Sequence, residues 1–369
     1  MKKVFTVIVI IMLMGGVILY FFGRPAKINT DKKIDGVSDE ICDVLYYSSL
    51  AANSHNTQSW KMKLDTKKQQ FTISLDKERS LKVVDPEYRE LYISLGCYLE
   101  TLNHAFDAYG YDIKIKYNKS IEDINSEVAK ISYYKRKNAK INTKQIETIK
   151  RRHTDKRSYK TDKINSEVIS NLSNNHNEIY YYEIDTKEFE YLKNGTIEAV
   201  SKQSKDNKYR EELNQWMRFS NKEVEQKKDG ISAEMIGLNG GIKSFYYLTT
   251  NHGNAESDKF AKQGIDTTKK QVNNCSAFFV ITGDDNIIDW IEVGREAQGL
   301  WYRCVNNNIA VQPLSAMLEV DSYSKKIKED LDVPKNVQMI LRVGYVDEYG
   351  QNAAVRRNLN EYVTVINEN

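Results

Sequence analysis

Hydrophobic residues change their spacing along the first part of the chain, and each change predicts a different element. Residues 41–50 carry apolar side chains at the spacing of an amphipathic helix. Segments 61–64 and 71–75 then alternate polar and apolar positions, as half-buried strands do. Helical spacing returns from residue 88 to residue 109, and a strand-like segment follows over 111–117. The pattern predicts a mixture of helices and strands.

The later segments extend this mixture. The nearly continuous apolar run 275–282 is typical of a strand that is buried on both faces. A helix is predicted over 290–305 and a central strand over 338–345. Polar composition predicts a helical connector over 118–150 and further helices over 187–264. Two shorter segments complete the pattern, namely a strand at 82–84 and a turn at 311–314.

The N-terminal segment has a different character. Residues 4–22 carry no charge, follow a basic flank at 1–3, and are long enough to cross a bilayer as a helix. A cleaved signal peptide is the competing interpretation, but the bulky residues 19–22 offer no small-residue cleavage site. We therefore expect a retained transmembrane anchor followed by a polar tether over 23–36. Basic residues on both sides of the anchor leave its orientation open.

Composition excludes several classes of function. The chain has 369 residues and a net charge of +3, so no overall field favours a nucleic-acid partner. Its four scattered cysteines contain no C-x-x-C pair and predict neither a zinc site nor a disulfide framework. Phosphate-loop, dinucleotide-binding, zinc-protease and serine-hydrolase motifs are absent from the sequence.

A polar loop joins the first predicted helix to the first predicted strand. Asn53, Ser54, Asn56 and Gln58 offer amides and a hydroxyl that both donate and accept hydrogen bonds. Such groups suit the edge of a flat heterocycle that carries carbonyls and ring N–H groups. The plainer interpretation is a turn in which these side chains only cap and bend the backbone.

A basic segment, 151–159, supplies a second candidate for binding. Its closely spaced cations and hydroxyl suit a compact dianion, which accepts charge-assisted hydrogen bonds. A solvated loop and a nucleic-acid patch are the alternatives, but the segment is short and has few interleaved aromatic residues. Arg218, by contrast, is expected to lie on a solvated helix.

The polar loop resembles a signature of the nitroreductase family, whose members are flavoenzymes that hold FMN. The pattern Ser54-x-Asn56-x-Gln58-x-Trp60 is similar to the family's Ser-x-Asn-x-Gln-Pro-Trp. Ser59 replaces the usual Pro, and Asn53 stands where a Ser is common. The resemblance implies that Asn53, Ser54, Asn56 and Gln58 contact the pyrimidine edge of the flavin.

Two further elements resemble the phosphate site of that family. Arg152, Thr154 and Lys156 occupy the positions of its Arg-x-Ser-x-Arg element, with Arg157 as an alternative for the last position. The closing segment 356–359, Arg-Arg-Asn-Leu, resembles the family's Arg-Arg-Pro-Leu. The resemblance therefore implies that Arg356 and Arg357 also belong to the FMN site.

The sequence also indicates two related halves. Gly96 and Leu102 match Gly294 and Leu300 at one constant offset of 198 residues. This repeat, with one loop and one phosphate element, resembles the tandem-fused Acg-type branch of the family. It implies an α+β nitroreductase-like fold with a mixed or antiparallel central sheet flanked by helices. The halves, 37–150 with the connector and 151–369, would form a pseudo-dimer with one composite site.

The function implied by the resemblance is an FMN-dependent oxidoreductase. Hydride would pass from NAD(P)H through the flavin to a nitroaromatic, a quinone or a similar acceptor, and no side chain need act as a catalytic acid, base or nucleophile. A non-catalytic protein that stores flavin or senses redox state is the alternative, and a tethered structural domain without a cofactor is a third. We expect the soluble part to be monomeric, with the membrane as partner through the N-terminal helix.

Overall fold

The computed structural model describes residues 15–16, 20–118, 120–121, 123–173 and 176–366. Most of the predicted anchor lies outside these ranges. Within them, no helix is both long and apolar enough to span a membrane. The anchor therefore stays a prediction from the sequence.

The first half of the chain forms a sheet covered by helices. Its elements are α2 (Asp39–Ser49), β1 (Trp60–Asp65), β2 (Gln70–Leu75), α3 (Arg89–Ala108), β3 (Tyr111–Tyr117), β4 (Glu127–Lys135) and α4 (Thr143–Arg151). The strands lie in the antiparallel order β3-β4-β2-β1. The helix predicted over 88–109 is confirmed, and so are the strands at 71–75 and 111–117.

The second half forms a sheet of its own. Its elements are α5 (Ser166–Ser173), β5 (Ile179–Glu183), β6 (Ala277–Gly283), α11 (Ile287–Asn306), β7 (Ile309–Pro313) and β8 (Asn336–Tyr345). The strands lie in the antiparallel order β5-β6-β8-β7. Every residue of β6 is buried, as its apolar run predicts.

The two sheets have the same topology. Read from its other end, the second sheet is β7-β8-β6-β5, which repeats β3-β4-β2-β1 strand for strand. In each half, a 20-residue helix, α3 or α11, joins the second strand of the half to the third. The described chain is therefore an α+β fold built from two related halves, as the repeat predicts.

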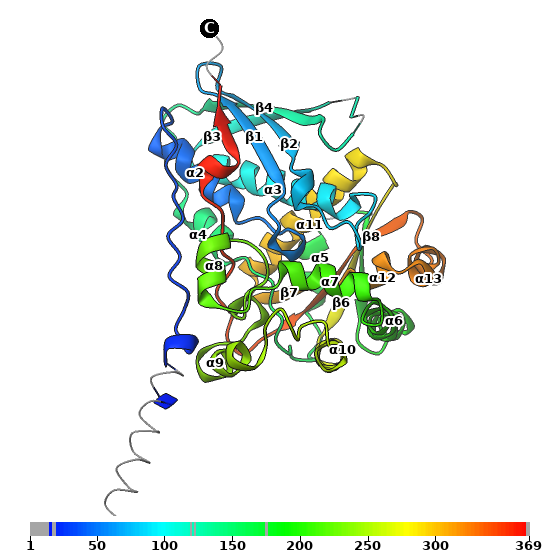
Figure 1. The fold of residues 1–369 in the computed structure, drawn as a ribbon. Coiled ribbons are helices and arrows are strands. Elements are labelled where there is room, and N and C mark those ends of the chain that lie inside the picture. Colours follow the sequence, from blue (N-terminus) through cyan, green and yellow to red (C-terminus); the bar gives the residue numbers. More distant parts are fainter. Residues whose placement is uncertain (1–14, 17–19, 119, 122, 174–175, 367–369) are drawn as a thin grey trace, which may run out of the picture.

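Most of the remaining helices form a long insertion and a shorter one. Between β5 and β6 lie α6 (Lys187–Gln203), α7 (Asn207–Trp216), α8 (Asn221–Lys227), α9 (Gly240–Thr249) and α10 (Asp258–Val272). Between β7 and β8 lie α12 (Ala316–Glu319), α13 (Asp321–Ser324) and α14 (Ile327–Asp330). The insertion confirms the polar helices predicted over 187–264, and Figure 1 shows it along one side of the molecule.

The end of the chain ties the halves together. Strand β9 (Val363–Val365) follows the second half but pairs in parallel with β1 of the first, with Met62 opposite Val363. The backbone N–H of Met62 also donates to the carbonyl of Tyr362 at 2.7 Å. The C-terminal residues before β9 must therefore pass beside the loop that precedes β1.

Helices α3 and α11 cross between the two sheets (Figure 1). A Cβ atom on Gly96 would lie 2.0 Å from the carbonyl oxygen of Ile291, and one on Gly294 would lie 2.0 Å from that of Ile93. The two contacts are reciprocal and related by the same offset of 198 residues. Glycine at both positions lets the two backbones touch, because any side chain would push them apart.

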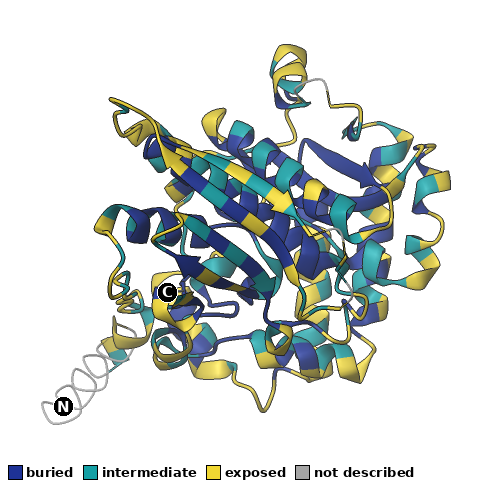
Figure 2. Cartoon of the chain, turned by 90° about the horizontal axis from the view of Figure 1, so that it is seen from above, coloured by how far each residue is buried: buried dark blue, intermediate teal, exposed yellow. Residues whose placement is uncertain are grey.

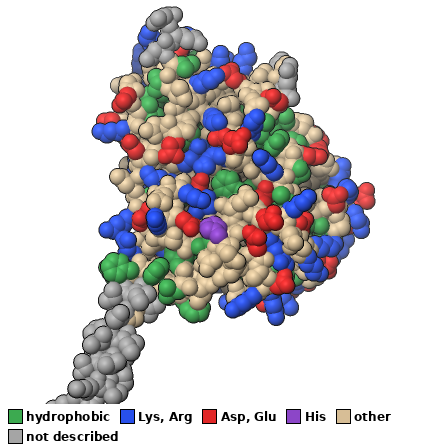
Figure 3. All heavy atoms as spheres, viewed as in Figure 1, with side chains coloured by type: hydrophobic (Ala, Val, Ile, Leu, Met, Phe, Trp, Pro, Cys, Tyr) green, Lys and Arg blue, Asp and Glu red, His purple; other side chains and the backbone are tan. Residues whose placement is uncertain are grey.

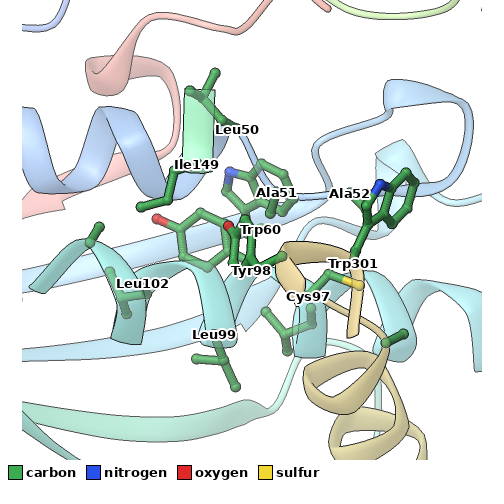
Figure 4. Close-up of a cluster of buried hydrophobic side chains, with 14 of the residues drawn as sticks. Leu50, Ala51, Ala52, Trp60, Cys97, Tyr98, Leu99, Leu102, Ile149 and Trp301 are labelled. Carbon is green, nitrogen blue, oxygen red and sulfur yellow. The ribbon is translucent and has the colours of Figure 1, made fainter. Parts of the chain in front are cut away.

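Aromatic residues fill the core on either side of this crossing. The Trp60 and Tyr98 rings lie 4.5 Å apart by their centroids, and both are fully buried. Figure 4 shows this pair beside Ala51, with Trp301 close to Cys97. In Figure 2 buried residues run through the centre of the molecule, and the surrounding loops are largely exposed. One hydrophobic core thus joins elements of both halves.

Several local predictions are wrong. The connector 118–150 contains strand β4 as well as α4, and residues 82–84 form a turn rather than a strand. The predicted turn at 311–314 is largely strand β7. Arg218 is not solvated, because it is 2% exposed and its guanidinium binds Asp229 at 2.6 Å. Contacts with residues that are distant in sequence determine the conformation of these segments and the burial of Arg218.

The predicted tether is bound to the surface of the folded chain. The carbonyl of Arg24 accepts hydrogen bonds from Asn221 at 3.1 Å and from Lys243 at 2.9 Å. Farther on, the Thr30 hydroxyl donates to the carbonyl of Arg356, and the carbonyl of Asp31 accepts the N–H of Leu359. Residues 23–36 therefore follow a fixed path.

The helix crossing leads to a first prediction. Gly294→Ala should lower the free energy of unfolding by about 1–3 kcal/mol, because its methyl group overpacks the contact with α3. Gly299→Ala on the same helix is the control, since its Cβ would meet only the flexible end of Arg303 at 3.4 Å. That change should stabilise the helix by about 0.5–1 kcal/mol. Equal effects in urea denaturation would contradict the close crossing.

Candidate functional site

A cavity of about 380 Å³ lies where the two halves meet, and the predicted loop and basic segment both line it. The first half contributes residues 51–56, and the second contributes residues 152–157 and Arg356. The predicted site residues that line the cavity are Asn53, Ser54, Asn56, Arg152, Thr154, Lys156, Arg157 and Arg356. Gln58 and Arg357 do not line it.

The loop before β1 has an unusual backbone. A short 3-10 helix spans Ser54–Asn56, and the φ angles of His55, Asn56 and Gln58 are 49°, 55° and 54°. Positive φ is uncommon for residues with side chains, and each such residue costs free energy unless its surroundings hold it. The Oδ1 atom of Asn53 accepts the N–H of Gln58 at 2.9 Å and helps to hold this shape.

Asn56 is committed to protein partners. Its Nδ2 donates to the carbonyls of Gly230 at 3.1 Å and Val355 at 3.2 Å, and its Oδ1 accepts from Arg356 at 2.9 Å. The residue is 3% exposed. The side chain therefore links the loop to the insertion and to the C-terminal segment. Such a structural role is the alternative to flavin contact that the sequence analysis gave for this loop.

Gln58 and Arg357 form a second internal link. The backbone N–H of Arg357 donates to Oε1 of Gln58 at 2.9 Å, and Nε2 of Gln58 donates to the carbonyl of Lys228 at 2.9 Å. The Arg357 guanidinium donates to the carbonyls of Gln58 and Trp60. These two residues hold the loop from behind and do not reach the cavity.

Ser54 is held from the other side of the loop. Its hydroxyl donates to Oε2 of Glu90 at 2.8 Å, and its backbone N–H donates to the Ser94 hydroxyl at 3.2 Å. Asp85 in turn accepts the backbone N–H groups of Glu90 and Leu91 at the start of α3. Burial, and second the neighbouring Glu90, raise the pKa of Asp85 to about 7. The start of α3 thus sets the position of Ser54.

Three cations of the cavity wall have no carboxylate partner among the described residues. Arg152 donates to the carbonyl of Leu50, and its Nε is buried without a hydrogen bond. Arg356 donates to the carbonyls of Ser49, Ala51 and Val355 besides Asn56. Both arginines thereby satisfy carbonyls at the C-terminal end of α2. The ammonium group of the third cation, Lys156, has no hydrogen bond or ion pair within the described ranges, although its backbone carbonyl accepts a hydrogen bond from Gln271.

Arg157 differs from these three, because Asp155 neutralises it. Its guanidinium binds both carboxylate oxygens of Asp155, with a closest distance of 2.6 Å. Although burial opposes it, hydrogen bonding from His153 and Arg157 holds the pKa of Asp155 well below its usual range. Of the two alternatives for the last basic position, Lys156 is therefore the one with an uncommitted charge.

Burial, and for Arg356 also a neighbouring charge, disfavours the charged forms of these cations. Burial lowers the pKa of Arg356 to about 9, and the positive charge of Arg152 adds to this effect. Burial also lowers the pKa of Arg152 and of Lys156. Charges that are desolvated without a partner cost free energy, and an anion in the cavity would recover that cost.

Apolar side chains line another part of the cavity. Ile231 and Met235 come from the segment between α8 and α9, and Leu314, Leu318 and Met339 come from the second half. Gly230 lies near the start of that segment with φ 71°, and a Cβ there would lie 2.4 Å from the carbonyl oxygen of Trp216. Glycine therefore fixes the path by which this segment reaches Asn56.

Sequence reasoning missed His55 and Glu90. His55 lies within the recognised motif at a position where any residue is allowed, and its Nδ1 is buried without a partner beside the cavity. Burial lowers its pKa to about 4, so the ring is neutral near pH 7. Glu90 carried no signal, because its role depends on the packing of α3 against the loop.

Comparison with known proteins gives results at the level of structure alone. No family model and no curated protein matches the chain. Among solved structures, it is similar to the FMN-dependent nitroreductase NfnB from Mycobacterium smegmatis in complex with NADPH. That match has 15% identity and a TM-score of 0.35, over 54% of this chain and 86% of the other.

Two further matches are of the same kind. A nitroreductase with bound FMN from Desulfitobacterium hafniense has 10% identity and a TM-score of 0.33, over 56% of this chain and 91% of the other. A nitroreductase-like protein from Bacillus cereus has 12% identity and a TM-score of 0.31, over 59% and 94%. TM-scores this low assign neither a family nor a function to the chain.

His55 gives a prediction for pH dependence. Its pKa of about 4 in the folded protein lies below the ordinary 6.5, so between these values the unfolded chain binds a proton that the folded chain does not. Because of His55, the free energy of unfolding should therefore fall by about 2 kcal/mol from pH 7 to pH 5. In urea denaturation, the His55→Gln variant should lack the loss of stability that His55 causes at lower pH. An identical pH dependence in the variant would contradict a lowered pKa of His55.

Proposed function

We propose that the cavity binds FMN and that the protein is an NAD(P)H-dependent flavin oxidoreductase of the nitroreductase type. The observation that carries the proposal is the set of uncompensated cations, Arg152, Lys156 and Arg356, around one cavity. Such a set suits a dianion, and the phosphate of FMN is one. The motifs that resemble the nitroreductase family supply the same cations.

The remaining lining fits the rest of FMN. The Thr154 hydroxyl lies between the two basic positions in sequence and has no hydrogen bond within the described chain. The apolar wall suits a flat aromatic ring, and His55 offers an unpartnered ring nitrogen at the loop. Arg152, Thr154 and Lys156 would therefore hold the phosphate, while the loop 53–56 would hold the ring.

The protein's own contribution is binding and orientation. When bound, FMN supplies the hydride chemistry, accepting two electrons from NAD(P)H and passing them to an acceptor such as a quinone or nitroaromatic. The internal hydrogen bonds of Asn56 and Gln58 keep the loop in its strained form, so its backbone and His55 would be held in place to contact the ring. The unpaired cations Arg152 and Lys156 would stabilise the negative charge of the phosphate.

Replacing Lys156 should raise the stability of the FMN-free protein and lower its affinity for FMN. Lys156→Met removes a desolvated charge that has no partner, so the FMN-free protein should melt at a higher temperature. The same change should weaken FMN binding roughly ten- to a hundredfold, because a hydrogen bond to a charged group contributes about 1.5–3 kcal/mol. Calorimetry of the FMN-free protein and titration with FMN measure the two effects.

Lys160→Met is the matched control. Its substitution changes the net charge equally, and Lys160 directly follows the basic segment, but it forms an exposed ion pair with Asp347 at 2.8 Å. FMN affinity should be unchanged in this variant. Equal losses of affinity in the two variants would mean that only net charge matters, and no loss in either would remove Lys156 from the phosphate site.

Stoichiometry and turnover give a second test. One loop and one basic segment meet in one cavity, so the protein should bind one FMN per chain, measured by absorbance after gel filtration. Anaerobic NADPH should bleach the bound flavin, and a quinone should restore its colour. Two flavins per chain would contradict the composite site. Bound flavin that NADPH does not reduce would favour the alternative of storage or redox sensing.

A further inference from the structure

Helix α9 exposes an apolar face that no described residue covers. Ile242 and Phe245 are each 67% exposed, and Leu248 is 50% exposed. These residues are spaced three apart, so they lie along one side of the helix. An apolar face of this kind on a protein surface marks a site of interaction.

The exposed face of α9 carries no charge. Among the ten residues of the helix, Lys243 alone is charged, and it is fully buried. Its ammonium group turns inward, where it binds Glu234 and donates to the carbonyl of Arg24 at 2.9 Å. The helix therefore presents hydrophobic side chains outward and keeps its cation beneath them.

The start of α9 touches the point where the N-terminal apolar run ends. A Cβ on Gly23 would lie 2.6 Å from the carbonyl oxygen of Gly240 and 2.7 Å from the Ser244 hydroxyl. Just before this contact, Tyr20 is 71% exposed and Phe21 is 57% exposed. Figure 1 shows α9 beside the first described helical turn, and Figure 3 shows hydrophobic side chains on the surface nearby.

We propose that α9 lies on the surface of a lipid bilayer, with Ile242, Phe245 and Leu248 inserted among the lipid chains. The uncharged run 4–22 is long enough to cross a bilayer and ends one residue before Gly23. A bilayer crossed by that run has its surface at the level of residues 20–24. Because α9 is bound to that point, its apolar face meets the same surface.

A lipid bilayer fits this face better than a protein partner does. Helices that lie in the interface plane bury an apolar face by about 5–10 Å and place aromatic residues near the headgroups. The described face comprises one short helix, and a stable protein interface needs about 800 Å² from each partner. Bilayer contact needs no such area, because the N-terminal run supplies the main attachment.

The position of α9 on a bilayer would also bring part of the cavity wall close to the lipid. Glu234, Met235, Gly237 and Asn239 line the cavity and lead directly into α9. If α9 lies on a bilayer, one wall of the cavity stands at the lipid surface, where a lipid-soluble electron acceptor would be concentrated. The position of α9 can be tested without reference to the cofactor, so the proposed function and this inference can fail separately.

A site-directed fluorescent probe tests the contact. The described cysteines Cys42, Cys97, Cys275 and Cys304 are free and buried, so an introduced surface cysteine can be labelled selectively. The full-length chain carrying Phe245→Cys is labelled with an environment-sensitive dye. It is then reconstituted into phosphatidylcholine–phosphatidylglycerol vesicles with or without nitroxide groups on the lipid chains.

Tyr134→Cys is the matched control, because Tyr134 is an exposed aromatic residue, 56% exposed, on β4 in the other half. Nitroxide lipids should quench the probe at 245 at least twofold more than the probe at 134. Ile242→Cys tests the same face should the first variant fail to fold. Equal quenching at 242 and 134, or at 245 and 134, would overturn the proposal.

Two other partners of the exposed face of α9 would each give a different experimental result. A second copy of the chain would give disulfide-linked dimers of the unlabelled Phe245→Cys variant that depend on protein concentration, without lipid quenching of the labelled one. The N-terminal segment folded over α9 would shield the probe before any lipid is added, again without quenching. Either result would replace the bilayer as the partner of α9.

Discussion

The contact between α3 and α11 at Gly96 and Gly294 is the constraint on which the rest of the structure depends. Because neither glycine has a side chain, each backbone can approach the carbonyl oxygen of the other helix. The two halves then share one hydrophobic core and stand in a fixed relation. The cavity lies between them, lined by a loop of the first half and a basic segment of the second. A wider crossing would separate these walls.

The cavity wall contains positive charges whose burial costs free energy. Arg152, Lys156 and Arg356 are desolvated without carboxylate partners in the described chain, and burial lowers the pKa of all three. The arginines recover part of this cost by satisfying carbonyls at the end of α2. The remainder would be recovered by an anion, so the same feature that destabilises the empty site gives it affinity for a phosphate.

Long elements and recurrent motifs could be predicted from the sequence, whereas short elements could not. The helix over 88–109 was clear because its apolar spacing persists for many residues, and the buried strand over 275–282 was clear because its run is nearly continuous. Strand β4 was missed because many of its positions are polar or exposed and because its partner β2 lies far earlier in the sequence. Arg218 was misplaced because its partner Asp229 comes from beyond the next helix.

The sequence alone determined which residues could build a site, through the loop 53–58, the basic segment 151–159 and the repeat that relates the halves. Only the tertiary structure decided what each residue does. Gln58 and Arg357 belong to the same motifs as Ser54 and Arg356, yet they do not line the cavity and are held by other parts of the chain. Motif membership follows from local order in the chain, but hydrogen bonding depends on which groups the fold brings within about 3 Å.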